Sequence, residues 1–150
     1  ASEKYGILMQ NRGSGFTLTQ DHPNEMKGGK RPMHTIIPAI LREQGRVTMP
    51  FGVMGGQFQP AGHARFLTNM IDFGMDMQQA MDLPRAFADR GQMRVERGFD
   101  DDVRQALTDL GHDVVIPPGP IGGAQAIRIH ESGVLEGASD CRKDGCAIGY

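Results

Sequence analysis

The sequence lacks tryptophan, has only two cysteines and contains no apolar run approaching the roughly 18 residues that a membrane span needs. Its charge is nearly balanced, with 16 basic against 18 acidic residues. Because proteins that bind nucleic acids or anionic membranes carry an excess of positive charge, we expect neither a nucleic acid nor a membrane as a partner. No signal peptide is recognisable, so we expect a cytoplasmic protein, with the periplasm as the alternative.

The two cysteines and the histidines do not form a metal-binding pattern. Cys141 and Cys146 can close a small loop, but they are too few for a disulfide framework or a zinc set, so free thiols are expected. The histidines have no ligand spacing. The acidic run of residues 100–102 precedes a helical pattern and is explained by the helix dipole. We therefore expect no metal and no cofactor.

Glycine and proline are abundant, with 21 and 9 residues. This composition predicts many turns, and 150 residues are enough for a single domain with a core. The apolar patterns predict strands over residues 5–9, 39–43, 47–53, 94–96, 114–116, 124–130 and 134–135, and helices over residues 60–74, 76–84 and 100–111. Residues 16–30 are expected to form a long loop. This order indicates an α+β layered domain with a mainly antiparallel sheet and two to three helices, in which residues 114–135 form an antiparallel tail.

The most informative stretch follows the strand predicted over residues 47–53. The strand ends at Gly55 and Gly56, and Pro60 follows in a position suited to the first turn of a helix. A strand, two glycines and a helix start can present backbone N–H groups to negative charge, such as a phosphate, a carboxylate or the oxyanion of acyl transfer. The alternative is a tight turn without a ligand.

No nucleophile is visible in the sequence. The G-x-S-x-G elbow, the phosphate-binding loop and the H-E-x-x-H motif are all absent, and the first residue is not Thr, Ser or Cys. Arg12, in a glycine-rich loop, has a guanidinium that can clamp a carboxylate, or it is simply solvated. His34 and Thr35 can act as donor or base, or as a local cap.

A series of short motifs resembles the C-terminal part of the small subunit of gamma-glutamyltranspeptidases, which are N-terminal-nucleophile (Ntn) hydrolases. The motifs occur in the family's order and cover nearly the whole chain. They are Gly6-Ile-Leu8 with Asn11, Gly29-Lys-Arg-Pro32 with Pro38, Gly55-Gly56, Ile71-Asp-Phe-Gly-Met75, Ala80 with Asp82, Pro84-Arg85, Arg94-Val-Glu96 with Gly98, Gly137-Ala-Ser-Asp140 and Gly149-Tyr150.

The resemblance implies part of a four-layer αββα sandwich and a proenzyme that cleaves itself to expose a threonine. That threonine is expected a few tens of residues upstream of Ala1, which makes this chain a fragment lacking the nucleophile segment. In the family the glycines matching Gly55 and Gly56 donate to the oxyanion, and two serines that hold the substrate carboxylate match His34 and Thr35. The chain itself is expected to be inactive.

The first loop departs from the family pattern. The resemblance places Arg12 and Gly15 where a glutamine and an acidic residue grip the α-amino group of a gamma-glutamyl donor. Because a cationic Arg12 repels an ammonium group and attracts a carboxylate, we expect an acyl donor without a free α-amine, such as an oxamate-like or glutaryl amide.

The expected partners are the large subunit, the N-terminal part of the small subunit, a small-molecule amide substrate and a possible second copy of the chain. Without the missing strands of the central sheets, the chain is expected to expose apolar surface and unpaired strand edges. The alternative function is a non-catalytic structural or interaction domain that keeps the fold.

Overall fold

The computed structural model describes residues 2–149, in two compact units formed by residues 1–35 and residues 36–150. Ala1 and Tyr150 lie outside the described residues, so the last residue of the Gly149-Tyr150 motif is not described.

The first unit is built from turns. Its one regular element within residues 2–35 is the 3-10 helix η1 (Arg12–Gly15), and residues 16–30 form the expected long loop, in which Thr17 pairs with Glu25. The prediction of a strand over residues 5–9 is wrong. Gly6 has φ 65° and turns the chain, so that Ile7 pairs back with Ser2. A glycine in the left-handed region ends an extended segment.

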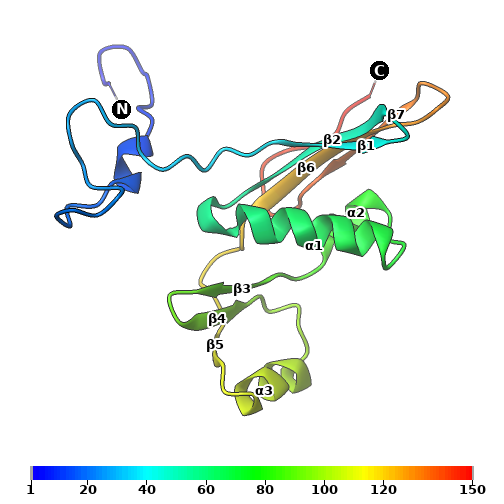
Figure 1. The fold of residues 1–150 in the computed structure, drawn as a ribbon. Coiled ribbons are helices and arrows are strands. Elements are labelled where there is room, and N and C mark those ends of the chain that lie inside the picture. Colours follow the sequence, from blue (N-terminus) through cyan, green and yellow to red (C-terminus); the bar gives the residue numbers. More distant parts are fainter. Residues whose placement is uncertain (1, 150) are drawn as a thin grey trace. The chain divides into compact units, whose positions relative to one another are not determined.

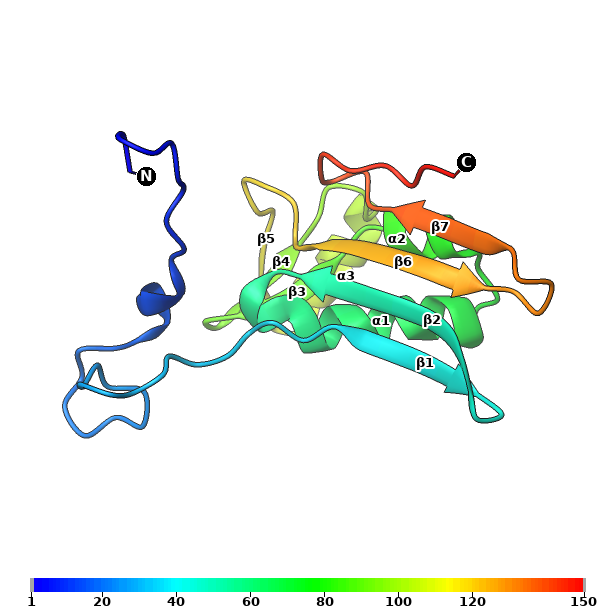
Figure 2. The ribbon, with the colours of Figure 1, turned by 90° about the horizontal axis from the view of Figure 1, so that it is seen from above.

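The second unit contains a four-stranded antiparallel sheet with the order β1-β2-β6-β7 (Figures 1 and 2). The strands are β1 (Ala39–Glu43), β2 (Arg46–Met54), β6 (Gly123–Ile129) and β7 (Leu135–Ser139). The strands predicted over residues 39–43 and 47–53 are present as β1 and β2, and they pair as a hairpin. Gln44 and Gly45 both have positive φ, 49° and 82°, which matches the right-handed twist of the two strands in a two-residue turn.

Two helices, α1 (Gln59–Ile71) and α2 (Met77–Asp82), lie on one face of this sheet (Figure 1). In β2, Met49, Phe51 and Val53 are buried beneath the helices, whereas Val47, near the start of the strand, is 42% exposed. The helices contribute Phe66, Met70, Met77, Ala80 and Met81 to the same core, and β6 and β7 contribute Ala124, Ala126 and Ala138. Each large side chain that is fully buried stabilises the fold by about 1.5–3 kcal/mol. Four methionines, Met49, Met70, Met77 and Met81, therefore fill much of this core.

A second, three-stranded sheet has the order β3-β4-β5, with β3 (Ala86–Asp89), β4 (Gln92–Val95) and β5 (Asp113–Val115). The helix α3 (Asp101–Asp109) connects β4 to β5 and was predicted, whereas β3 was not. The prediction that β5 belongs to the antiparallel tail is wrong, because β5 pairs with β4 in parallel. A helical crossover returns the chain in the same direction, and this produces the parallel pair.

The sheet face opposite α1 and α2 is open and apolar. Ile40, Ile127 and Leu135 are 62%, 46% and 65% exposed, respectively. These residues line a groove of about 1220 Å³, which the C-terminal segment from Cys146 to Gly149 borders. The exposed apolar surface expected from the sequence is present. Within residues 2–149, no helix is long and apolar enough to cross a membrane.

Candidate active site

The turn formed by Gly55 and Gly56 stands where β2 ends and the path to α1 begins. Gly55 has φ 134° and Gly56 has φ 59°, so both positions lie in a region that side-chain-bearing residues rarely adopt. The 3-10 turn η2 (Gly56–Phe58) follows, and α1 starts at Gln59 with a proline in its first turn. The predicted order of strand, glycine pair and helix start is therefore confirmed.

The two glycine amides are unoccupied. Within the described chain, the backbone N–H groups of Gly55 and Gly56 donate no hydrogen bond, and both residues are exposed. Backbone N–H groups that are free of internal partners can donate hydrogen bonds to an anion. The turn thus has the donors that an oxyanion site requires.

The turn is supported from beneath by Gly122 and Phe58. A Cβ atom added to Gly55 would lie 3.0 Å from Gly122 Cα and 3.3 Å from Phe58 Cβ and Cδ1. One added to Gly122 would lie 2.4 Å from the carbonyl oxygen of Met54. Because these contacts leave no room for a methyl group, glycine is required at positions 55 and 122 by packing as well as by φ.

His63 fixes the end of β2 from the side of α1. Its Nε2 atom accepts a hydrogen bond from the Val53 N–H at 3.0 Å, and its ring packs edge-on against Phe51 with centroids 5.1 Å apart. Burial lowers the pKa of His63, because desolvation disfavours the charged imidazolium. The neutral ring that results is the form that can accept from Val53.

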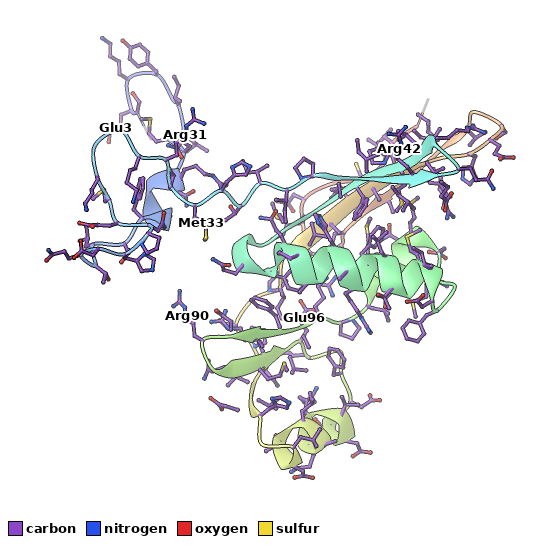
Figure 3. The ribbon with its side chains drawn as sticks, viewed as in Figure 1. Glu3, Arg31, Met33, Arg42, Arg90 and Glu96 are labelled. Carbon is purple, nitrogen blue, oxygen red and sulfur yellow. The ribbon has the colours of Figure 1, made fainter. Side chains whose placement is uncertain are left out.

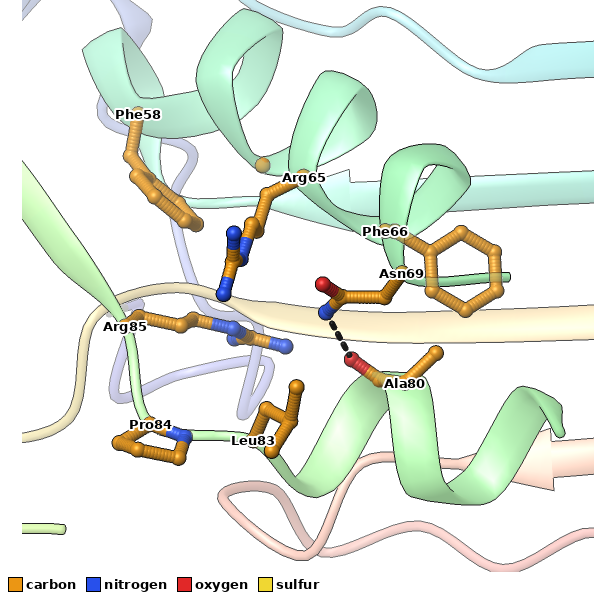
Figure 4. A pocket seen from close by; sticks show the side chains of 9 residues that line it. Phe58, Arg65, Phe66, Asn69, Ala80, Leu83, Pro84 and Arg85 are labelled. Atoms are coloured by element: carbon orange, nitrogen blue, oxygen red, sulfur yellow. Dashed lines mark hydrogen bonds between the residues drawn. The ribbon is translucent and has the colours of Figure 1, made fainter. Parts of the chain in front are cut away.

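A small cavity lies behind the turn, between α1, α2 and the segment leading to β3 (Figure 4). Phe58, Arg65, Asn69 and Arg85 are among its lining residues, and its volume is about 10 Å³. Asn69 donates from Nδ2 to the carbonyl of Ala80 at 3.2 Å, while its buried Oδ1 has no partner within residues 2–149. A volume of this size holds about one water molecule, so this cavity is not a substrate site.

A buried cluster of two arginines and two carboxylates joins the two sheets. Arg85 contacts Asp140 at 2.5 Å, and Arg142 contacts Glu96 at 2.7 Å and Asp140 at 3.2 Å. The four side chains are between 0% and 11% exposed. In Figure 3, Glu96 lies among the side chains between α1 and β3, whereas Arg90 projects from the β3–β4 turn.

Hydrogen bonds set the charge state of both carboxylates. Burial by itself raises the pKa of Glu96, but hydrogen bonds from Arg142, the Ile121 N–H and the Arg85 N–H outweigh burial, and the pKa lies below its usual value. Burial also raises the pKa of Asp140, and the Arg142 N–H together with Arg85 more than offsets it. The cluster is therefore ionised and carries no net charge.

The other predicted site residues lie in the first unit. Arg12 donates from Nη1 to the Thr35 hydroxyl at 2.5 Å, so the structure brings these two residues together. His34 is exposed and makes no hydrogen bond among the described residues. The carbonyl of Gly15 accepts from Asn24. Gly55 and Gly56 belong to the second unit.

Sequence reasoning missed His63, Gly122 and the charged cluster. Arg85, Glu96 and Asp140 were noted only as parts of short motifs, and Arg142 only as part of the loop between the cysteines. The local sequence gave little sign that these four charged residues are buried. They stand beside apolar residues, but charged residues in such positions are usually exposed to solvent. Both cysteines are free and exposed, as predicted. Within residues 2–149, no group of three or more His, Cys, Asp or Glu side chains is placed to hold a metal ion.

The chain is similar in sequence to proteins of one family. The sequence model of the gamma-glutamyltranspeptidase family matches residues 1–150. The chain is 41% identical to the glutathione hydrolase-like YwrD proenzyme of Bacillus subtilis over 153 residues, and 39% identical to the oxamate amidohydrolase proenzyme of Klebsiella pneumoniae over 155 residues. These matches cover 96% and 97% of this chain, but the chain spans only 29% of the length of either relative.

Solved structures agree with the sequence matches. The cephalosporin acylase from Bacillus halodurans is 42% identical, with a TM-score of 0.83 over 97% of this chain and 28% of that protein. The gamma-glutamyltranspeptidase from Pseudomonas nitroreducens is 21% identical, with a TM-score of 0.87 over 99% of this chain and 84% of the matched chain. The latter similarity shows the fold.

Proposed function

Because this chain belongs to the gamma-glutamyltranspeptidase family, we propose that it is the C-terminal portion of the small subunit of an Ntn amide hydrolase or acyltransferase. The parent protein attacks an amide with a threonine located upstream of Ala1 and passes through an acyl-enzyme. This portion supplies the oxyanion-binding amides and contacts to a substrate carboxylate. We infer that the nucleophile belongs to the upstream portion, so the chain alone is expected to be inactive.

The free N–H groups of Gly55 and Gly56 carry the proposal. When the threonine oxygen adds to the substrate carbonyl, the carbonyl oxygen becomes an alkoxide that needs donors already in place. The two amides have no competing internal acceptor among residues 2–149, and Gly122 and Phe58 pack closely against the turn. Preorganised donors of this kind stabilise the transition state without reorganisation, and removing one typically costs on the order of 100- to 1000-fold in rate.

The first unit supports a proposal about the acyl donor. Arg12 and Thr35 are joined by a hydrogen bond, so a cation and a hydroxyl stand together as donors for a carboxylate. His34, beside Thr35, is exposed and adds a ring nitrogen. One relative is an oxamate amidohydrolase proenzyme and one neighbour is a cephalosporin acylase. The donor is therefore an amide that carries a carboxylate and no free α-amine.

The missing portion of the parent protein is the main partner. The chain spans 29% of the length of its relatives, which are proenzymes. The open apolar face of the β1-β2-β6-β7 sheet needs a cover, and the remaining strands of the αββα sandwich provide one. Active enzyme thus requires the large subunit and the upstream part of the small subunit.

The test uses the complete gene product that contains this chain. Hydrolysis of a glutaryl anilide and a gamma-glutamyl anilide is compared, and we expect the glutaryl compound to be preferred. The Gly55→Ala variant displaces the amide against Gly122 and should lower kcat by about 100-fold or more.

Gly119→Ala is the matched control for this experiment. Gly119 is an exposed glycine outside the groove, and an added Cβ meets nothing within 4 Å. Its kcat should stay close to that of the unmodified protein. An inactive complete protein with no threonine at a processed N-terminus supports the alternative, a non-catalytic interaction domain.

A further inference from the structure

The Gly55 turn rests on a second backbone segment, Ile121–Gly122, which precedes β6. A Cβ added to Gly122 would lie 2.4 Å from the Met54 carbonyl oxygen and 2.7 Å from Phe58 Cδ1. The Gly55 and Gly122 backbones are therefore in direct contact, with no side chain between them. Because close-packed atoms transmit displacement, the position of the Gly55 amide follows the position of Gly122.

Charged side chains hold Ile121 at both of its backbone polar groups. Its N–H donates to Glu96 Oε1 at 2.8 Å, and its carbonyl accepts from Arg85 Nη1 at 2.8 Å. Hydrogen bonds to charged groups are roughly twice as strong as neutral ones. Ile121 is only 8% exposed, so water does not replace a bond that is lost. This segment is consequently fixed from two sides.

Arg85 reaches the turn by a second route. Its guanidinium lies 5.8 Å from the centroid of the Phe58 ring, and Phe58 is the other support beneath Gly55. Both structures that carry the turn, the Phe58 ring and the Ile121–Gly122 segment, therefore contact the same guanidinium. Asp140 and the carbonyl of Met81 orient Arg85 in turn, at 2.5 Å and 3.3 Å.

We propose that Arg85 and Glu96 are positioning residues for the Gly55–Gly56 turn: through Ile121 and Gly122 they set where the two amides meet the oxyanion. This inference rests on the oxyanion role proposed above. Neither side chain touches the reacting atoms. The buried cluster thus does more than join the two sheets, because two of its four members control the geometry of the catalytic donors.

Arg142 provides a control within the same cluster. It bonds to Glu96, Asp140 and the carbonyls of Met81 and Leu83, and among the described residues it donates no hydrogen bond to Ile121. Arg142→Lys keeps a cation beside the Glu96 carboxylate, whose Oε1 atom Arg142 shares with the Ile121 N–H, and it removes neither hydrogen bond to Ile121. Asp76→Ala, which removes the N-cap of α2, is a second control for a general loss of stability.

The experiment compares Glu96→Gln, Arg85→Lys and the two controls in the complete, processed gene product. The measurements are kcat and KM for the preferred anilide and the inhibition constant of a boronic acid analogue, whose tetrahedral adduct with the threonine carries an oxyanion-like hydroxyl. A misplacement of about 1 Å remote from the chemistry can cost on the order of 100-fold. We expect Glu96→Gln and Arg85→Lys to lower kcat by roughly 10- to 100-fold at nearly constant KM, with a parallel loss of boronate affinity.

The controls should retain most of their kcat and boronate affinity. An equal fall of kcat in Arg142→Lys would mean that the cluster supports the fold in general. A rise of KM at constant kcat in Glu96→Gln would mean that Glu96 affects substrate binding and not the transition state. Either result overturns the positioning role. If Glu96→Gln yields no processed enzyme, Glu96→Asp keeps the charge and shortens the reach to Ile121, and the same kcat loss is expected.

The Gly55→Ala variant separates this inference from the proposed function. If Gly55→Ala loses kcat while Glu96→Gln and Arg85→Lys do not, only the positioning role fails. If Gly55→Ala keeps its kcat, the oxyanion role itself fails.

Discussion

Gly55 shows how a single residue constrains the site, since both its φ of 134° and its contact with Gly122 require the absence of a side chain. Neighbouring His63 acts in a different way. It occupies the Val53 N–H at the end of β2, where the β1 strand no longer pairs, and it does so only while its ring is neutral. The strand end that leads into the glycine turn therefore depends on the protonation state of His63.

Because the His63 ring is partly buried in its neutral form, we expect the folded protein to lose stability in mild acid. The pKa of His63 is lowered in the folded protein by burial, so the unfolded state binds the proton more readily. The contribution to stability is complete above the unfolded pKa of about 6.5 and is lost as pH falls through the folded pKa. Urea unfolding between pH 7.5 and 5 should show a weaker pH dependence in His63→Gln than in the unmodified protein. His112→Gln, at an exposed position, should leave the dependence unchanged.

We expect the charge of Arg12 to select which acyl donor the parent enzyme uses. Arg12→Gln removes the cation that repels an ammonium group and places there the residue of the family pattern. We expect the ratio of kcat/KM for gamma-glutamyl anilide over glutaryl anilide to rise by about 10-fold, which corresponds to about 1.4 kcal/mol. Arg46→Gln is the control, because Arg46 makes only an exposed contact with Glu131 at 3.8 Å. An unchanged ratio in Arg12→Gln would show that Arg12 does not select the donor.

Among the elements, α2 depends most on its cap, because it has only six residues. Asp76 accepts from the Gln79 N–H at 2.7 Å, and Gln79 Oε1 accepts from the Asp76 N–H at 3.3 Å, which completes a capping box. The short helix carries Met77 and Met81 into the core. In contrast, α3 buries none of its residues, and its N-terminal Asp100 makes no side-chain cap.

The capping box predicts a measurable stability difference between two similar substitutions. Asp76→Ala should lower the free energy of unfolding by about 1 kcal/mol, within a range of about 0.5–2. Asp72→Ala, at the exposed C-terminal end of α1, should change it by less than about 0.5 kcal/mol. Denaturant titration of the two variants measures both values. Equal effects would mean that the cap does not stabilise α2.

At the level of the complete chain, the second unit has a core on only one face of its larger sheet. Methionine, phenylalanine and alanine side chains fill the face beneath α1 and α2, while the opposite face holds an open apolar groove. An apolar face of this extent normally marks an interface. In the function proposed above, the remaining portion of the parent protein covers this groove, and the folded state of the chain is then coupled to that portion.

The open face predicts that the 150-residue chain, produced alone, self-associates and binds a hydrophobic dye. Replacing Ile127 and Leu135 together by threonine should reduce dye fluorescence and the associated mass measured by light scattering. Leu110→Thr is a matched control, because Leu110 is 77% exposed but lies outside the groove. A monomer that binds no dye would contradict the prediction.

The sequence by itself determined the features that depend on neighbouring residues. The β1–β2 hairpin, the Gly55–Gly56 turn before α1, the Asp76 capping box and the methionine core all follow from local periodicity and turn chemistry. Tertiary structure alone decided the parallel pairing of β5, the contact of Gly122 with Gly55 and the burial of four charged side chains. Arg85 and Asp140 are 55 positions apart, and Glu96 and Arg142 are 46 apart. A buried charge is tolerated only with a partner, and these partners come from distant segments that no local pattern connects.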